Sequence, residues 1–144
     1  GIKDQVIAFE VVKPEKDLLV VSARGLGKRT DLGHYRSQGR GGKGIQAMKL
    51  TDRTGAIVAA GMVAPEDAVM LMNTRGIAIR ISASTISKIG RTTQGVTLMK
   101  LGQNEEVASM TIIEPRDPVS NAHLNGLSGG AVGLVESVPV DVSE

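Results

Sequence analysis

Residues 18–50 read LLVVSARGLGKRTDLGHYRSQGRGGKGIQAMKL, and residues 69–101 read VMLMNTRGIAIRISASTISKIGRTTQGVTLMKL. The second segment repeats the first without a gap. The identical pairs are Arg24/Arg75, Gly25/Gly76, Arg29/Arg80, Gly39/Gly90, Arg40/Arg91, Gly44/Gly95, Met48/Met99, Lys49/Lys100 and Leu50/Leu101. Repeats of about 50 residues predict stacked units, because one unit cannot bury both of its faces alone.

Each copy has the pattern of short β-strands, and no window keeps an apolar period of 3.6 residues. Gly25 and Gly76 lie where two-residue hairpin turns would require a positive φ. The expected strands are Leu18–Ser22, Leu26–Thr30, Ile45–Leu50 and Ala56–Val63, then Ala68–Met72, Ile77–Ile81, Val96–Leu101 and Glu106–Ile113. Four strands in each unit favour an all-β fold of propeller-like blades with four-stranded antiparallel sheets. Met48 and Met99 recur at equal repeat positions and are expected in the core.

The chain divides into four parts on this interpretation. Residues 1–12 are the last strand of a preceding blade, because Gln5–Val12 resembles the closing strand of each copy. Residues 13–64 form one blade and residues 65–113 the last blade. Residues 114–144 are rich in Gly and Pro and are expected to be a flexible acidic tail, with a short packed strand as the alternative. The first residue is Gly1 rather than Met, which indicates a piece of a longer protein.

The net charge of +2 conceals a strong asymmetry. Residues 13–101 carry 15 Lys/Arg and 6 Asp/Glu, whereas residues 102–144 carry 1 Arg and 7 Asp/Glu. A basic body with an acidic end indicates a polyanionic partner. The chain has no cysteine for disulfides or thiolate metal sites, and no apolar run of about 18 residues to span a membrane.

The densest candidate site is Gln38-Gly-Arg-Gly-Gly-Lys-Gly44. Glycines let a backbone approach a phosphate closely, while Arg40 and Lys43 supply charge. A merely solubilising loop is the alternative, but the upstream cations favour binding. Aromatic residues make up only 1% of the chain, so base stacking is not expected. Repeated cations suit a duplex backbone, bound without sequence preference.

Other chemistries find little support in the sequence. The stretch Gly25–Thr30 has a fragment of a phosphate loop, but its glycine spacing and the following strand pattern argue against nucleotide binding. Tyr35 is the only tyrosine and is interpreted as a packing or rim residue. His34 and His123 lack metal-ligand spacing, and no pair of carboxylates suggests acid/base catalysis. We therefore expect no catalytic residue and no metal site.

The motifs Gly27-Lys-Arg-Thr30, Tyr35-Arg-Ser-Gln-Gly-Arg-Gly-Gly-Lys-Gly-Ile45 and Gly90-Arg-Thr-Thr-Gln-Gly-Val96 resemble the C-terminal domain of the A subunits of bacterial DNA gyrases. The resemblance covers roughly residues 1–116. It implies a β-pinwheel that wraps duplex DNA around a basic rim and so supports ATP-dependent negative supercoiling. The family's box has a basic residue where this chain has Gly39, and it lies in the first blade. Residues 38–44 are therefore interpreted as a box-like repeat element.

The resemblance also implies partners and a location. The B subunit, together with the rest of the A subunit, would complete an A2B2 holoenzyme in the bacterial cytoplasm, on the chromosome and not at a membrane. Catalysis, ATP and Mg would belong elsewhere in that holoenzyme, with no cofactor in this fragment. The expected DNA-binding residues are Arg24, Lys28, Arg29, Arg36, Gln38, Arg40, Gly41, Gly42, Lys43, Gly44, Arg75, Arg80, Lys88 and Arg91. The alternatives are the equivalent domain of topoisomerase IV and a propeller-type protein-interaction module.

Overall fold

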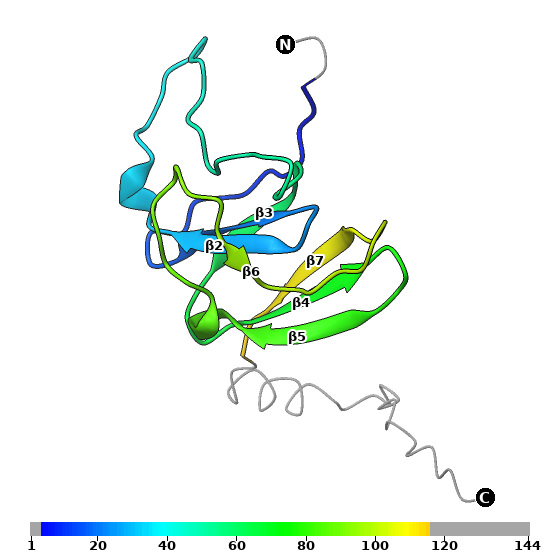
Figure 1. The fold of residues 1–144 in the computed structure, drawn as a ribbon. Helices are drawn as coiled ribbons and strands as arrows, with labels where there is room; N and C mark the ends of the chain where they lie inside the picture. The colour runs from blue at the N-terminus through cyan, green and yellow to red at the C-terminus, as the bar shows by residue number, and fades with distance from the viewer. Residues whose placement is uncertain (1–3, 116–144) are drawn as a thin grey trace, which may run out of the picture.

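The computed structural model describes residues 4–115, which form two antiparallel β-sheets (Figure 1). The strands are β1 (Asp17–Ser22), β2 (Leu26–Thr30), β3 (Ile57–Val63), β4 (Ala68–Asn73), β5 (Ala78–Ser82), β6 (Val96–Thr97) and β7 (Val107–Ile113). Two short 3-10 helices, η1 (Leu32–His34) and η2 (Ala83–Thr85), follow β2 and β5. The described residues contain no α-helix, and the prediction of an all-β fold is confirmed.

The hairpins β1–β2 and β4–β5 turn at the predicted glycines. Gly25 and Gly76 have φ values of 80° and 82°. Three residues separate Ser22 from Leu26 and Asn73 from Ile77, so each loop is one residue longer than predicted. Three-residue loops place a glycine in the left-handed conformation after a tight turn, which accounts for both glycines.

The second repeat contributes a strand to the sheet of the first. The first sheet has the order β3-β1-β2-β6, and its fourth strand comes from the second repeat. Leu26 pairs with Thr97 and Gly27 with Val96, as Figure 1 shows for β2 and β6. We expected each unit to supply all four of its own strands. In the described part of the chain, the second sheet has only three strands, in the order β5-β4-β7.

One hydrophobic core lies between the sheets. Leu19, Val21 and Val63 of the first sheet and Val69, Leu71 and Val107 of the second belong to a single buried cluster. Each sheet therefore buries one face against the other repeat, as the stacking argument requires. Met48 and Met99 are both buried, as expected, but only Met99 belongs to this cluster.

Three predicted strand segments differ from the structure. Residues 45–50, 98–101 and 5–12 are not strands. Val96–Thr97 pair because β2 of the first repeat lies beside them, whereas no equivalent strand of an earlier repeat lies beside residues 45–50 within the described range. Val6 and Phe9 are about nine-tenths exposed. The assignment of residues 1–12 to a preceding blade, and the other domain boundaries, stay predictions.

The proposed acidic tail falls almost entirely on residues 116–144, outside the described residues. Between residues 4 and 115, no helix is long and apolar enough to cross a membrane.

Candidate nucleic-acid interface

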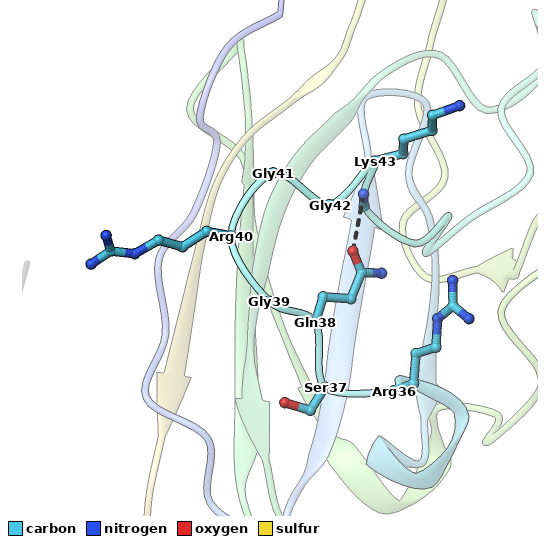
Figure 2. Close-up of a pocket in the computed structure, with 9 residues that line it drawn as sticks. Arg36, Ser37, Gln38, Gly39, Arg40, Gly41, Gly42 and Lys43 are labelled. Carbon is cyan, nitrogen blue, oxygen red and sulfur yellow. Dashed lines mark hydrogen bonds between the residues drawn. The ribbon is translucent and has the colours of Figure 1, made fainter.

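The loop of residues 36–44 leaves the first sheet after η1 and forms an open concave surface (Figure 2). Arg36, Gln38, Arg40 and Lys43 are all exposed. In Figure 2, Arg40 points to one side of the loop, and Arg36 and Lys43 point to the other. The loop therefore offers cations on both of its sides.

Glycine geometry shapes this loop. The Gly44 amide donates to Gln38 Oε1 at 3.3 Å, which closes the loop on itself. Gly41 and Gly44 have φ values of 75° and 80°, a conformation that other residues rarely adopt. A Cβ on Gly42 would come within 2.4 Å of Gln38 Oε1, whereas one on Gly41 or Gly44 would meet nothing within 4 Å. Residues 38–44 therefore form a tight turn, and its backbone at Gly41 and Gly44 is open to a ligand such as a phosphate group.

A second concavity joins the two repeats. Its lining includes His34, Arg36 and Gln46 of the first repeat and Arg91 of the second. Arg91 Nη1 donates to the Gln46 carbonyl at 3.0 Å, and its Cζ lies 5.8 Å from the centre of the Tyr35 ring. This is a cation–π distance, and the half-buried ring helps to hold the guanidinium in place. Burial raises the pKa of Tyr35 above its usual value. Two cations from successive repeats thus line one open concavity.

Lys28 does not belong to the exposed set, which corrects the sequence prediction. Its side chain is fully buried. The ammonium group donates to the carbonyls of Gly90, Arg91 and Thr93 at 2.7, 2.5 and 3.0 Å, and to Thr93 Oγ1 at 3.1 Å. Burial lowers the pKa of Lys28 to about 8, and the charge of Arg91 acts in the same direction. Lys28 is used inside the protein and cannot reach a phosphate in this conformation.

Arg29 is corrected for the same reason. It is 8% exposed and lies in an internal network. Its Nη1 pairs with Asp17 Oδ2 at 3.3 Å, and its Nε donates to the Ile86 carbonyl at 2.9 Å. A buried guanidinium needs such partners, so Arg29 joins β2 to the segment after η2.

The remaining predicted cations are exposed but lie in different places. Figure 1 shows the β1–β2 and β4–β5 turns, which carry Arg24 and Arg75, at the opposite end of the sheets from η1 and η2. Arg75 also pairs with Glu105 at 3.1 Å. Lys88 pairs with Asp17 and Asp31 at 2.8 and 3.2 Å, and these two carboxylates raise its pKa. The structure brings Arg91 to the loop 36–44 but does not gather all fourteen predicted residues.

Sequence reasoning missed His34 and Gln46 as lining residues, as well as the contact between Tyr35 and Arg91. The repeat spacing aligned Arg40 with Arg91 but carried no signal that Arg91 would lie beside Tyr35. That contact follows from the place of β6, which carries the second repeat's loop onto the first sheet.

Comparison with known proteins shows which family has this architecture. A family model described as "DNA gyrase C-terminal domain, beta-propeller" matches residues 16–64 and 67–114. The chain belongs to this family. Each matched segment of the gyrase C-terminal domain family contains one of the two repeats described above.

A similar sequence and a similar solved structure support this family assignment. The DNA gyrase A protein of Staphylococcus epidermidis is 39% identical over 116 residues, which cover 79% of this chain and 13% of that relative. The chain therefore spans a small part of the relative's length. A solved structure of the DNA gyrase A C-terminal domain superposes with a TM-score of 0.67 at 29% identity, over 71% of this chain and 35% of that one.

The C-terminal domain of DNA topoisomerase IV superposes with a TM-score of 0.71 at 18% identity, over 81% of this chain and 37% of that one. At this identity, the likeness shows a shared fold.

Proposed function

We propose that this chain binds duplex DNA through the phosphate backbone and forms part of the DNA-wrapping domain of a gyrase A protein. The observation that carries the proposal is the position of Arg36 and Arg91. They come from successive repeats and line one concavity, and Arg36 is also part of the exposed loop 36–44. A cationic surface that continues from one repeat to the next matches a ligand with regularly spaced charge.

The chemistry of the loop favours phosphate over bases. Arg40 and Lys43 are exposed, and the glycines between them leave the backbone open. Arginine binds phosphate oxygens in a forked geometry, and lysine contributes a point charge. Tyr35 is engaged with Arg91, and the chain has few other aromatic groups to stack on unpaired bases. Binding is therefore expected to be independent of sequence.

At the level of the whole enzyme, we infer a supporting role in negative supercoiling. DNA held on this surface would be presented to the strand-passage core of a type II topoisomerase, and this chain itself would carry out no reaction step. ATP and Mg would act elsewhere in an A2B2 holoenzyme that contains the B subunit. The proposed location is the bacterial cytoplasm, on the chromosome.

Two alternatives share the same fold. The equivalent domain of topoisomerase IV is less favoured, because the identity to its solved structure is 18% against 29% for the gyrase domain. A protein-interaction module would use apolar or hydrogen-bonding contacts, and its binding would depend little on salt. Exposed cations around an open loop favour DNA over that alternative.

The experiment is a salt titration of duplex affinity, with three unrelated duplex sequences. Log affinity should fall linearly with log salt at about 0.9 for each phosphate neutralised, and equally for all three sequences. Arg40→Ala/Lys43→Ala should weaken each duplex alike and reduce the slope by about 2, roughly 1 for each cation removed.

The control for this titration removes the same charge from outside the loop. Arg53→Ala/Lys100→Ala changes two exposed cations that do not line either concavity. If the control lowers the slope as much as the loop variant, net charge alone governs binding, and the loop is not an interface.

A further inference from the structure

We propose that Lys28 is a positioning residue that acts across the repeat boundary: its buried ammonium holds the loop 90–93 of the next repeat so that Arg91 faces the DNA surface. This inference rests on the proposed DNA binding for its functional consequence. Its structural part, the clamp itself, can be tested without DNA.

Backbone pairing along β2 leaves a gap that Lys28 fills. On one side of the gap, the Arg29 amide donates to the Ser87 carbonyl at 3.0 Å, and the Ile89 amide donates to the Arg29 carbonyl at 2.9 Å. On the other side, Gly27 pairs with Val96. Residues 90–95 therefore bulge away from the strand between two paired points, and their carbonyl groups cannot join its ladder.

The ammonium group satisfies these carbonyls. Gly90, Arg91 and Thr93 all direct their carbonyl oxygens to Lys28 Nζ. Thr93 Oγ1 is a fourth acceptor for Lys28 and also donates to the Gly90 carbonyl at 2.9 Å, which ties the loop to itself. Lys28 is buried and these contacts are partly buried, so the loop carbonyls supply the partners that a buried ammonium requires.

The clamp connects directly to the candidate interface. Lys28 holds the main chain of Arg91 by its carbonyl, while the Arg91 side chain reaches Gln46 and the Tyr35 ring. A binding group is held precisely when the residues behind it are themselves fixed. Removing the ammonium would free the Arg91 backbone without removing the guanidinium.

The repeat also shows where the clamp is absent. The position equivalent to Lys28 in the second repeat is Ile79, which cannot donate a hydrogen bond from its side chain. The segment equivalent to 90–93 in the first repeat is Gly39–Gly42, where a Cβ on Gly39 or Gly41 would meet nothing within 4 Å. The described residues contain one junction between repeats, and Lys28 lies in it.

The first test uses the unmodified 144-residue chain. Nitrogen-15 side-chain NMR should find a Lys28 ammonium whose protons exchange slowly with water and couple to the loop carbonyls. An ammonium in fast exchange with solvent would overturn the clamp even if no variant could be folded.

The second test compares Lys28→Met with Val63→Ala. Val63 is fully buried on β3, at the other edge of the first sheet from β6. Lys28→Met should raise amide hydrogen exchange at least tenfold for Ile89 and Leu98, which donate to the Arg29 and Gly25 carbonyls on either side of the loop, and leave β4 and β7 protected. Val63→Ala controls for general loss of stability. Equal exchange of these two amides in both variants would overturn the clamp.

The third test asks whether Lys28 acts through Arg91. Arg91→Ala should lower duplex affinity about tenfold in 0.1 M salt, the effect of one phosphate contact. Lys28→Met should lower it by a similar or smaller factor, and the double variant should bind no more weakly than Arg91→Ala. Additive losses, or full affinity in Lys28→Met, would overturn the positioning role.

If the proposed DNA binding is wrong, the measurements should differ from those expected when only the clamp is wrong. In that case Arg91→Ala and Arg40→Ala/Lys43→Ala would both leave duplex affinity unchanged, whatever the exchange rates in the loop.

Discussion

Gly95 of the second repeat lies against the backbone of Gly27 in the first: a Cβ added to Gly95 would come within 2.7 Å of the Gly27 carbonyl oxygen. Gly95 also has a φ of 81°. Its repeat equivalent, Gly44, has nearly the same φ of 80°, but a Cβ there would meet nothing within 4 Å. Both positions therefore favour glycine for its backbone conformation, but only Gly95 also requires glycine because no space is left for a side chain.

Replacing each glycine by alanine should therefore give unequal effects. Gly44→Ala should lower the free energy of unfolding by about 1–2 kcal/mol, the usual strain of a left-handed residue. Gly95→Ala carries the same strain and also forces β6 away from β2, which adds about 1–3 kcal/mol. Urea unfolding of both variants measures the difference. Equal losses would show that the close approach of the two repeats does not hold in solution.

Because the two sheets share one core, substitutions at the neighbouring residues Leu71 and Met72 of β4 should differ in their effect on the free energy of unfolding. Leu71 is fully buried in the cluster between the sheets, whereas Met72 is 40% exposed on the other face of the strand. Leu71→Ala should lower the free energy of unfolding by about 2–5 kcal/mol, because it leaves a cavity. Met72→Ala should change it by less than about 1 kcal/mol. A similar loss in both would mean that the two sheets do not pack as described.

Glu105 should make the free energy of unfolding depend on pH in the acidic range. Its carboxylate accepts from the Gly102 amide at 3.1 Å and pairs with Arg75 at 3.1 Å, and both contacts hold the pKa of Glu105 below its ordinary value of 4.5. The folded chain therefore binds this proton less readily than the unfolded chain. Its stabilising contribution is complete above about pH 4.5 and is lost as the pH falls through the lowered folded-state pKa.

Glu105→Gln should remove that contribution. The difference in free energy of unfolding between the unmodified chain and the variant should be largest near neutral pH and should shrink in acid, as the pH falls through the folded-state pKa of Glu105. Denaturant titrations at several pH values measure it. A difference that stays constant with pH would show that the charge of Glu105 is not responsible.

The sequence predicted the repeat, most of the strands and the positive φ of the two turn glycines, because each has a local signature. Gly25 and Gly76 follow apolar runs at equal positions, and both have the expected positive φ, in loops one residue longer than predicted. The pairing of β6 with the sheet of the preceding repeat has no such signature. A fixed repeat spacing is equally compatible with β6 pairing in its own sheet or in that of the preceding repeat, and the choice depends on packing over the whole junction.

The candidate site was predicted only in part for a related reason. Lysine and arginine are usually exposed, so Lys28 and Arg29 were expected at the surface. Their burial depends on groups that lie far along the chain or across the sheet, such as the Gly90 carbonyl and the Asp17 carboxylate. The loop 36–44 could be recognised because its glycines and cations are contiguous.

The central claim, that this surface serves DNA wrapping, is tested most directly in a complete gyrase reconstituted from its A and B proteins. Residues 38–44 would be replaced there by a neutral loop of Gly and Ser with the same length. Supercoiling, relaxation and DNA cleavage would then be measured on one plasmid. We expect reduced supercoiling with relaxation and cleavage retained, because those two reactions depend on the distant core. Unchanged supercoiling, or loss of cleavage, would contradict the account.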